Sequence, residues 1–145
     1  MPYKLDSVKI LLVDDLQPFI EVTASVLNIF GFQNIVTARN GQEGFEVFKK
    51  EHPDLVITDW QMEPVNGLEM TKLIRTDPQS PDPFVPILVM TGYSSRIRVE
   101  TARDHGMTEF IVKPFSSKDL YMRIKQIIEK PRQFVDADTF FGPDR

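Results

Sequence analysis

The sequence predicts an α/β fold in which helices cover both faces of a parallel β-sheet. Two patterns along the 145 residues support this fold class. Short continuous apolar runs, typical of strands that are covered on both faces, alternate with segments of helical periodicity. Charged or hydroxyl-bearing residues follow four of these runs directly, and parallel sheets of this kind bind their ligands at the carboxyl ends of the strands.

The chain begins with a predicted strand and a predicted helix. The run Ile10 to Val13, extended by Val8, is the first strand. A helical pattern follows from about Pro18 to Phe30 and ends where Gly31 can cap it. We expect this helix to turn one apolar face to the core, composed of Phe19, Val22, Val26, Ile29 and Phe30.

A weaker strand and a second helix come next. Ile35 and Val36 form the strand, and Asn40 with Gly41 begins the helix, which ends before Pro53. The helical residues predicted to face inward are Phe45 and Phe48. The order strand, helix, strand, helix is typical of a doubly wound sheet.

The middle of the chain contributes a third strand, a third helix and a long loop. The apolar run of this strand is Leu55–Ile57, and the strand itself ends at Asp59. The helix follows Asn66 and Gly67. Residues 77–86 contain four prolines, so this segment is expected to form an extended surface loop.

Two further strands, at 87–90 and 110–112, each precede a helix. One helix is expected from residue 94 or 95 to about 105, ended by Gly106, and the other opens at residue 116 or 117. The inward residues of this last helix are Leu120, Ile124, Ile127 and Ile128. Five strands and five helices fit a flavodoxin-like, doubly wound sheet with the strand order 2-1-3-4-5.

Composition narrows the classes of protein. The chain has 17 basic and 21 acidic residues, a net charge of -4 and a pI near 5.2, which disfavours direct binding to nucleic acid. It has no cysteine, so neither disulfides nor thiolate metal sites are expected. No apolar stretch approaches the ~18 residues of a membrane span, and no signal peptide is evident. We expect an unprocessed cytoplasmic protein with one domain over residues 1–130 and a tail over 131–145.

The polar residues at the strand ends predict one site. Asp14 and Asp15 follow the first strand, Asp59 ends the third, Thr91 follows the fourth and Lys113 follows the fifth. Each has an ordinary alternative role as a helix cap, a turn residue or a polar stop. Together, three converging carboxylates suit Mg²⁺, which prefers oxygen ligands, and Lys113 adds a second positive charge. An aspartate can also attack a phosphoryl group, whose oxygens a metal, a lysine and a hydroxyl then stabilise.

At these residues the chain resembles the receiver domain of two-component response regulators, the family that includes the stand-alone chemotaxis regulator. The resemblance covers about residues 8–130, and its most specific segments are Leu12-Val13-Asp14-Asp15, Asp59-Trp60-Gln61-Met62, Asn66-Gly67-Leu68-Glu69, Met90-Thr91-Gly92 and Phe110-Ile111-Val112-Lys113-Pro114-Phe115. It implies that Asp59 is the phosphoacceptor and that Asp14 and Asp15, with Asp59, hold Mg²⁺. Thr91 would be the switch hydroxyl, Lys113 the contact to the phosphoryl group, and Phe110 the aromatic switch residue.

The chain also departs from the family pattern. Glu63 separates Met62 from Pro64, where the usual motif has proline directly after the methionine. Gln61 and Tyr93, each two residues beyond a site residue, occupy positions that in this family border the path of the water that attacks the phosphoryl group. Phe110 replaces the tyrosine of some relatives, so no hydroxyl opposes its burial.

Two other functions compete with this interpretation. A phosphohydrolase of the haloacid dehalogenase class also uses a nucleophilic aspartate, but it needs an acid two residues later, where this chain has Gln61. A receiver-like interaction module without phosphate chemistry would not need the complete set of site residues. No Walker loop or nucleophile elbow is present, and His52 and His105 lack metal-ligand spacing.

The expected function is that of a single-domain response regulator and not of an enzyme acting on a separate substrate. Its expected partners are a histidine kinase or phosphotransfer protein and a downstream protein, bound through the fourth helix, fifth strand and fifth helix. Arginines of the fourth helix, at 96, 98 and 103, fit either an acidic partner surface or an ordinary solvated helix face. The tail, with three phenylalanines, either folds back on the domain or docks on a partner. The protein is expected to be a monomer or a phosphorylation-dependent dimer.

Overall fold

The fold, as seen in a computed structural model, is a five-stranded parallel sheet with the strand order β2-β1-β3-β4-β5, as predicted. The structure describes residues 5–92, 100, 103–104 and 106–129. The strands are β1 (Lys9–Val13), β2 (Asn34–Ala38), β3 (Leu55–Asp59), β4 (Ile87–Thr91) and β5 (Glu109–Val112). Every residue of β3 and β4 is buried, which explains why their sequences are continuous apolar runs.

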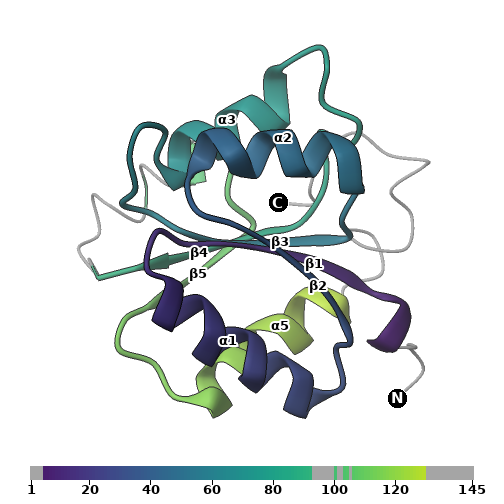
Figure 1. Cartoon of the computed structure of the whole chain (residues 1–145), viewed down its shortest axis with the longest axis vertical. Coiled ribbons are helices and arrows are strands. Elements are labelled where there is room, and N and C mark those ends of the chain that lie inside the picture. The colour runs from purple at the N-terminus through teal and green to yellow at the C-terminus, as the bar shows by residue number, and fades with distance from the viewer. Residues whose placement is uncertain (1–4, 93–99, 101–102, 105, 130–145) are drawn as a thin grey trace.

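Helices cover both faces of the sheet (Figure 1). They are α1 (Gln17–Phe30), α2 (Gly41–Glu51), α3 (Gly67–Thr76) and α5 (Ser117–Ile128), with a short 3-10 turn at Leu5–Ser7. Helices α1 and α5 lie on one face and α2 and α3 on the other (Figure 1). The helix expected over residues 94–105 falls mostly outside the described residues, but Glu100, Arg103 and Asp104 are helical.

The predicted helix boundaries agree closely with the structure. Asn66 caps α3 and Ser116 caps α5, each within a capping box, and Asn40 caps α2. Gly31 ends α1 with a φ of 112°, a left-handed conformation in which glycine has no steric penalty. The proline-containing segment 77–86 is a loop, as expected.

One prediction about the core was only partly right, because Phe19, Val26 and Phe30 pack against the core but the other two predicted residues of α1 do not. In α1 the buried residues are Ile20, Thr23 and Leu27, whereas Val22 is 61% and Ile29 is 82% exposed. The helix has apolar residues on more than one face, so its periodicity is compatible with two different inward stripes. The inward residues predicted for α2 and α5 are all buried.

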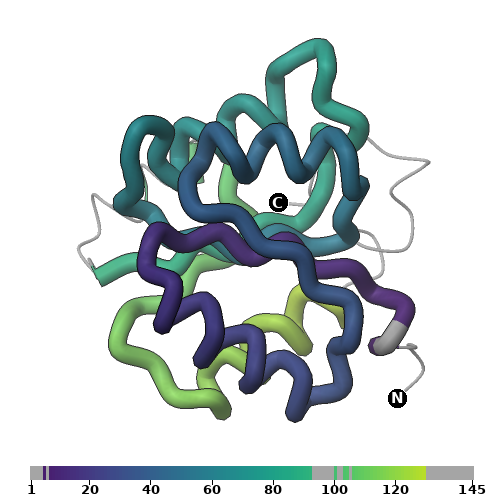
Figure 2. Tube along the Cα trace, in the orientation of Figure 1, coloured from purple at the N-terminus to yellow at the C-terminus, as the bar shows by residue number. Residues whose placement is uncertain are grey.

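The buried residues form two clusters, one on each face of the sheet. One lies beneath α2 and α3 and the other beneath α1 and α5. Figure 2 shows the chain leaving β1 and β5 on the same side of the sheet to enter α1 and α5. This parallel arrangement brings strand ends that are distant in sequence to one edge. Within the described residues, no helix combines the length and the apolarity that a bilayer span needs.

Candidate functional site

The predicted site residues lie where the parallel strands end. Asp59 is the last residue of β3 and Thr91 the last of β4, while Asp14 and Lys113 directly follow β1 and β5. The register pairs Asp59 with Met90, so Asp59 and Thr91 end adjacent strands one residue apart. The backbone N–H of Lys113 donates to the Thr91 carbonyl at 2.7 Å, which ties the end of β5 to that of β4.

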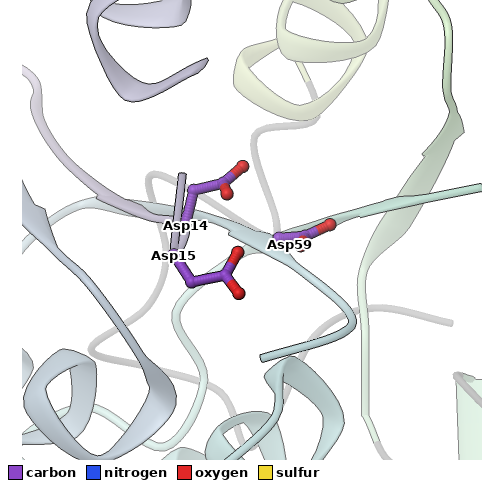
Figure 3. Close-up of side chains that lie close together, drawn as sticks. All are labelled: Asp14, Asp15 and Asp59. Carbon is purple, nitrogen blue, oxygen red and sulfur yellow. The ribbon is translucent and has the colours of Figure 1, made fainter. Parts of the chain in front are cut away.

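Three carboxylates gather at this edge. They belong to Asp14, Asp15 and Asp59, and one carboxylate oxygen from each lies within 4.8 Å of the other two. Figure 3 shows them side by side, two from the segment after β1 and one from the end of β3. Asp14 is fully buried and Asp59 nearly so, whereas Asp15 is exposed. The cluster therefore combines two carboxylates inside the fold with one that faces solvent.

Lys113 supplies the positive charge at the cluster. Its Nζ donates to Asp59 Oδ1 at 2.9 Å and lies 3.8 Å from Asp14 Oδ2. The peptide bond between Lys113 and Pro114 is cis. The lysine thus contacts the predicted phosphoacceptor directly and one of the predicted metal ligands at longer range.

Backbone contacts hold the acidic residues in place. Asp14 Oδ1 accepts a hydrogen bond from the N–H of Leu16 at 3.0 Å, and Leu16, not an aspartate, is the N-cap of α1. On the other side, the N–H of Gly67 donates to the Trp60 carbonyl at 2.8 Å. A Cβ at Gly67 would collide with the carbonyl oxygen of Asp59, so glycine allows α3 to begin directly against the phosphoacceptor strand.

Burial makes the ionised carboxylates costly. The pKa of Asp14 is raised from 3.8 to about 6, chiefly by burial and further by the charges of Asp59 and Asp15. The hydrogen bond from Leu16 and the charge of Lys113 oppose this rise. The pKa of Asp59 is also raised, again mainly by burial and against the hydrogen bond from Lys113. One lysine does not offset the desolvation of both carboxylates.

These observations fit a hard divalent cation. Among the described residues, Asp14 Oδ2 is one of two buried side-chain polar atoms without a hydrogen-bond partner, and it faces the cluster's lysine only at 3.8 Å. This oxygen and the two neighbouring carboxylates together form a set of oxygen ligands that suits Mg²⁺. The residues that could hold the ion are Asp14, Asp15 and Asp59.

The structure places the other predicted residues around this site. Thr91 is buried, and Gln61 and Glu63 are exposed in the loop after β3, where the Glu63–Pro64 bond is cis. Phe110 is half-buried on β5, at the edge of the sheet. Tyr93, also predicted to influence the site, lies outside the described residues.

Phe19 contacts the site although its sequence position did not predict a role there. This residue was predicted to belong to the core stripe of α1, and the centre of its ring lies 4.4 Å from Lys113 Nζ. The ring also borders an apolar groove of about 530 Å³ between α1 and the start of α5. The sequence offered one indication of this contact: Phe19 lies in the first turn of the helix that follows Asp14 and Asp15.

The fold and the site define a doubly wound α/β protein with a charged site at the carboxyl edge of its sheet. The model of the response regulator receiver domain matches residues 10–125. The chain therefore belongs to the family of response regulator receiver domains.

Curated relatives support this membership. The chemotaxis protein CheY-3 of Vibrio cholerae is 32% identical over 124 residues, which cover 86% of this chain and 94% of that protein. A CheY homolog of Campylobacter jejuni is 31% identical over 121 residues, or 83% and 92% of the two chains. The probable transcriptional regulator ycf27 of Porphyridium aerugineum is 32% identical over 122 residues, 84% of this chain. The match spans only 48% of that longer protein.

Solved structures show the same fold. The chemotaxis response regulator CheY4 of Vibrio cholerae has a TM-score of 0.75 and 28% identity, covering 82% of this chain and 97% of its own. A response regulator from Chloroflexus aurantiacus, described as putative in its name, has a TM-score of 0.75 and 26% identity. That alignment covers 86% of this chain and all of the other. This chain is thus a CheY-like receiver domain.

Proposed function

We propose that this receiver domain accepts a phosphoryl group on Asp59 from a histidine kinase or phosphotransfer protein in a Mg²⁺-dependent reaction. The observation that carries the proposal is the contact between Asp59 and Lys113, at 2.9 Å, inside a cluster of three carboxylates. The proposal applies to residues 1–130 as the receiver domain. Residues 131–145, the proposed tail, lie outside the described residues.

In the proposed reaction, a carboxylate oxygen of Asp59 attacks the phosphorus of a phosphohistidine. The new oxygen–phosphorus bond forms as the nitrogen–phosphorus bond breaks, and the departing imidazole nitrogen keeps the electron pair. Lys113 donates to the phosphoryl oxygens from the position it already holds beside Asp59, and the Thr91 hydroxyl is proposed as a second donor. Mg²⁺ held by Asp14, Asp15 and Asp59 would neutralise charge on these oxygens.

The proposed output is a change in the surface formed by the fourth helix, β5 and α5. Phosphoryl oxygens at Asp59 would draw Thr91 inward and make room for the Phe110 ring. Within the described part of this surface, Glu109 binds Arg123 at 3.0 Å, and Arg123 lies 5.7 Å from the centre of the Phe110 ring. A downstream protein would bind this surface, with the receiver as a monomer or as a phosphorylation-dependent dimer.

The alternatives make different chemical demands. A haloacid dehalogenase-type hydrolase would need an acidic proton donor at the exposed Gln61, which an amide does not supply. A phosphate-independent module has no use for a buried carboxylate whose Oδ2 lacks a hydrogen-bond partner within the described part of the chain, because such a group costs stability. The chemistry of the site therefore favours phosphoryl acceptance over both.

Intact mass after incubation with Mg²⁺ and a small acyl-phosphate donor tests the proposal. We expect one added phosphoryl group on the wild type and none on Asp59→Asn or on the wild type in a metal chelator. Asp104→Asn, which removes an exposed carboxylate outside the cluster, should still accept one group. If neither this donor nor a panel of phosphorylated histidine kinases gives an adduct, the protein is a phosphate-independent interaction module.

A further inference from the structure

We infer that Phe19 is a positioning residue that holds the Lys113 ammonium against Asp59. The inference rests on the proposed function, because it assigns Phe19 a part in phosphorylation of Asp59. Lys113 Nζ lies 4.4 Å from the centre of the Phe19 ring while it donates to Asp59 Oδ1 at 2.9 Å. The ammonium is therefore held by a ring and by a carboxylate at the same time.

The contact has the geometry of a cation–π interaction. A lysine ammonium within about 6 Å of a ring centre is attracted by the electron density of the ring face. An apolar ring also excludes water from the ammonium, so the attraction between Lys113 and the carboxylates is less screened. Lysine otherwise has a flexible stem with many rotamers, and fixing it beforehand removes an entropic cost from the reaction.

The Phe19 ring is itself fixed. Phe115, two residues after Lys113, meets it edge-on with ring centres 6.1 Å apart and planes at 84°. At the backbone, the N–H of Phe19 donates to the Leu16 carbonyl at 3.0 Å, and the N–H of Leu16 donates to Asp14. One turn of the chain thus orients both the buried carboxylate and the ring that faces the lysine.

Phe19 lies at the margin of the core, because it packs against the cluster beneath α1 and α5 without being fully buried itself. It is half-buried and borders the groove between α1 and α5, whose wall also includes Val22, Val26 and Leu120. Residues of α1 that face the sheet, such as Ile20 and Leu27, are distinct from it. A change at Phe19 is therefore expected to act on Lys113 more than on folding.

The test is the rate of Asp59 phosphorylation by a small acyl-phosphate donor, which needs no protein partner. In this reaction the aspartate oxygen bonds to phosphorus and the donor leaves as a free carboxylate. We expect Phe19→Leu to lower the maximal rate at saturating Mg²⁺ about two- to fivefold, the size of one modest cation–π contact. Phe19→Tyr, which keeps an aromatic face, should retain the wild-type rate.

Two controls separate positioning from a general effect on structure. Val22→Ala opens the same groove without touching the aromatic pair and should leave the rate unchanged. In proton NMR, the methylene next to the Lys113 ammonium should show an upfield ring-current shift that is lost in Phe19→Leu and retained in Phe19→Tyr.

Each outcome is decisive. A wild-type rate for Phe19→Leu, an equal loss in Val22→Ala or Phe19→Tyr, or no ring-current shift in the wild type overturns the inference. In all of these cases wild-type phosphorylation continues, so the proposed function survives. If the wild type itself accepts no phosphoryl group, the proposed function fails, and the positioning role falls with it.

Discussion

Asp14 is the site residue whose burial is expected to cost the fold the most stability. It is fully buried, its Oδ2 has no hydrogen-bond partner among the described residues, and its pKa is raised to about 6. A structural aspartate at this position would be expected to have its oxygens satisfied. A divalent cation bound by the three carboxylates would satisfy this oxygen.

Asp14→Asn should stabilise the protein in a metal chelator at pH 8 by about 1–2 kcal/mol. This gain is smaller than the free energy that corresponds to the whole pKa shift, because Lys113 loses the negative charge of Asp14. The sign follows from the folded pKa being above the unfolded one. The fold binds the proton more tightly, so the wild type loses stability as the pH rises from about 4 to about 6. Urea unfolding of both proteins at pH 4 and pH 8 measures this.

Mg²⁺ should reverse the order at pH 8. Bound only by the folded wild type, the ion adds stability according to its concentration and affinity, whereas the variant has lost a ligand. Asp15→Asn, at the exposed member of the cluster, should show little stabilisation in chelator and still lose the Mg²⁺ effect. A destabilised Asp14→Asn protein in chelator would mean that the buried carboxylate is structural.

At the scale of elements, the close approach of α3 to β3 positions the phosphoacceptor. Gly67 is both the first residue of α3 and the donor to the Trp60 carbonyl. Its missing side chain leaves room for the backbone of Asp59. The capping box of Asn66 and Glu69 fixes the helix start at this point.

Gly67→Ala should therefore displace the start of α3 and destabilise the fold by about 1–3 kcal/mol, the usual cost of forcing an extra group into a packed site. Gly92→Ala is the matched control, because a Cβ there would meet no atom of the described residues within 4 Å. Urea unfolding compares the two variants, and the rate of phosphorylation should fall only in Gly67→Ala. Equal stability of both variants would show that α3 adjusts without cost.

The strands and the residues at their ends could be predicted from the sequence, because a single physical rule determines each of them. Buried parallel strands require continuous apolar runs, and their shared direction brings Asp14, Asp59, Thr91 and Lys113 to one edge. The prediction for α1 was only partly right, because two apolar stripes were compatible with the same period and packing buried the one with Ile20 and Leu27 most deeply. The contact of Phe19 with Lys113 depends on that choice, so the sequence could not predict it.

At the scale of the whole molecule, the proposed switch must connect a central strand with an edge. Asp59 ends β3, whereas Phe110 lies on β5, two strands away. Between them, Thr91 ends β4 and accepts the backbone hydrogen bond from Lys113. At the outer end, Glu109 accepts hydrogen bonds from Arg123 and from the N–H of Phe110.

Thr91→Ala should leave Asp59 able to accept a phosphoryl group but weaken the response of Phe110. A hydrogen bond to a charged oxygen contributes about 1.5–3 kcal/mol, whereas a complete shift from 1:99 to 99:1 needs about 5.5 kcal/mol. Removing the hydroxyl is thus expected to reduce the population shift without abolishing it. Chemical shifts of Glu109, Phe110 and Arg123, recorded before and after phosphorylation, measure the response.

Thr37→Ala provides the matched control, since this exposed threonine lies on β2, at the opposite edge of the sheet. It should keep the full chemical-shift change at Phe110. A full change in Thr91→Ala, at equal occupancy of Asp59, would contradict the coupling through Thr91. Because Lys113 also contacts Asp59, the signal would then have to pass from the lysine along β5 to Phe110.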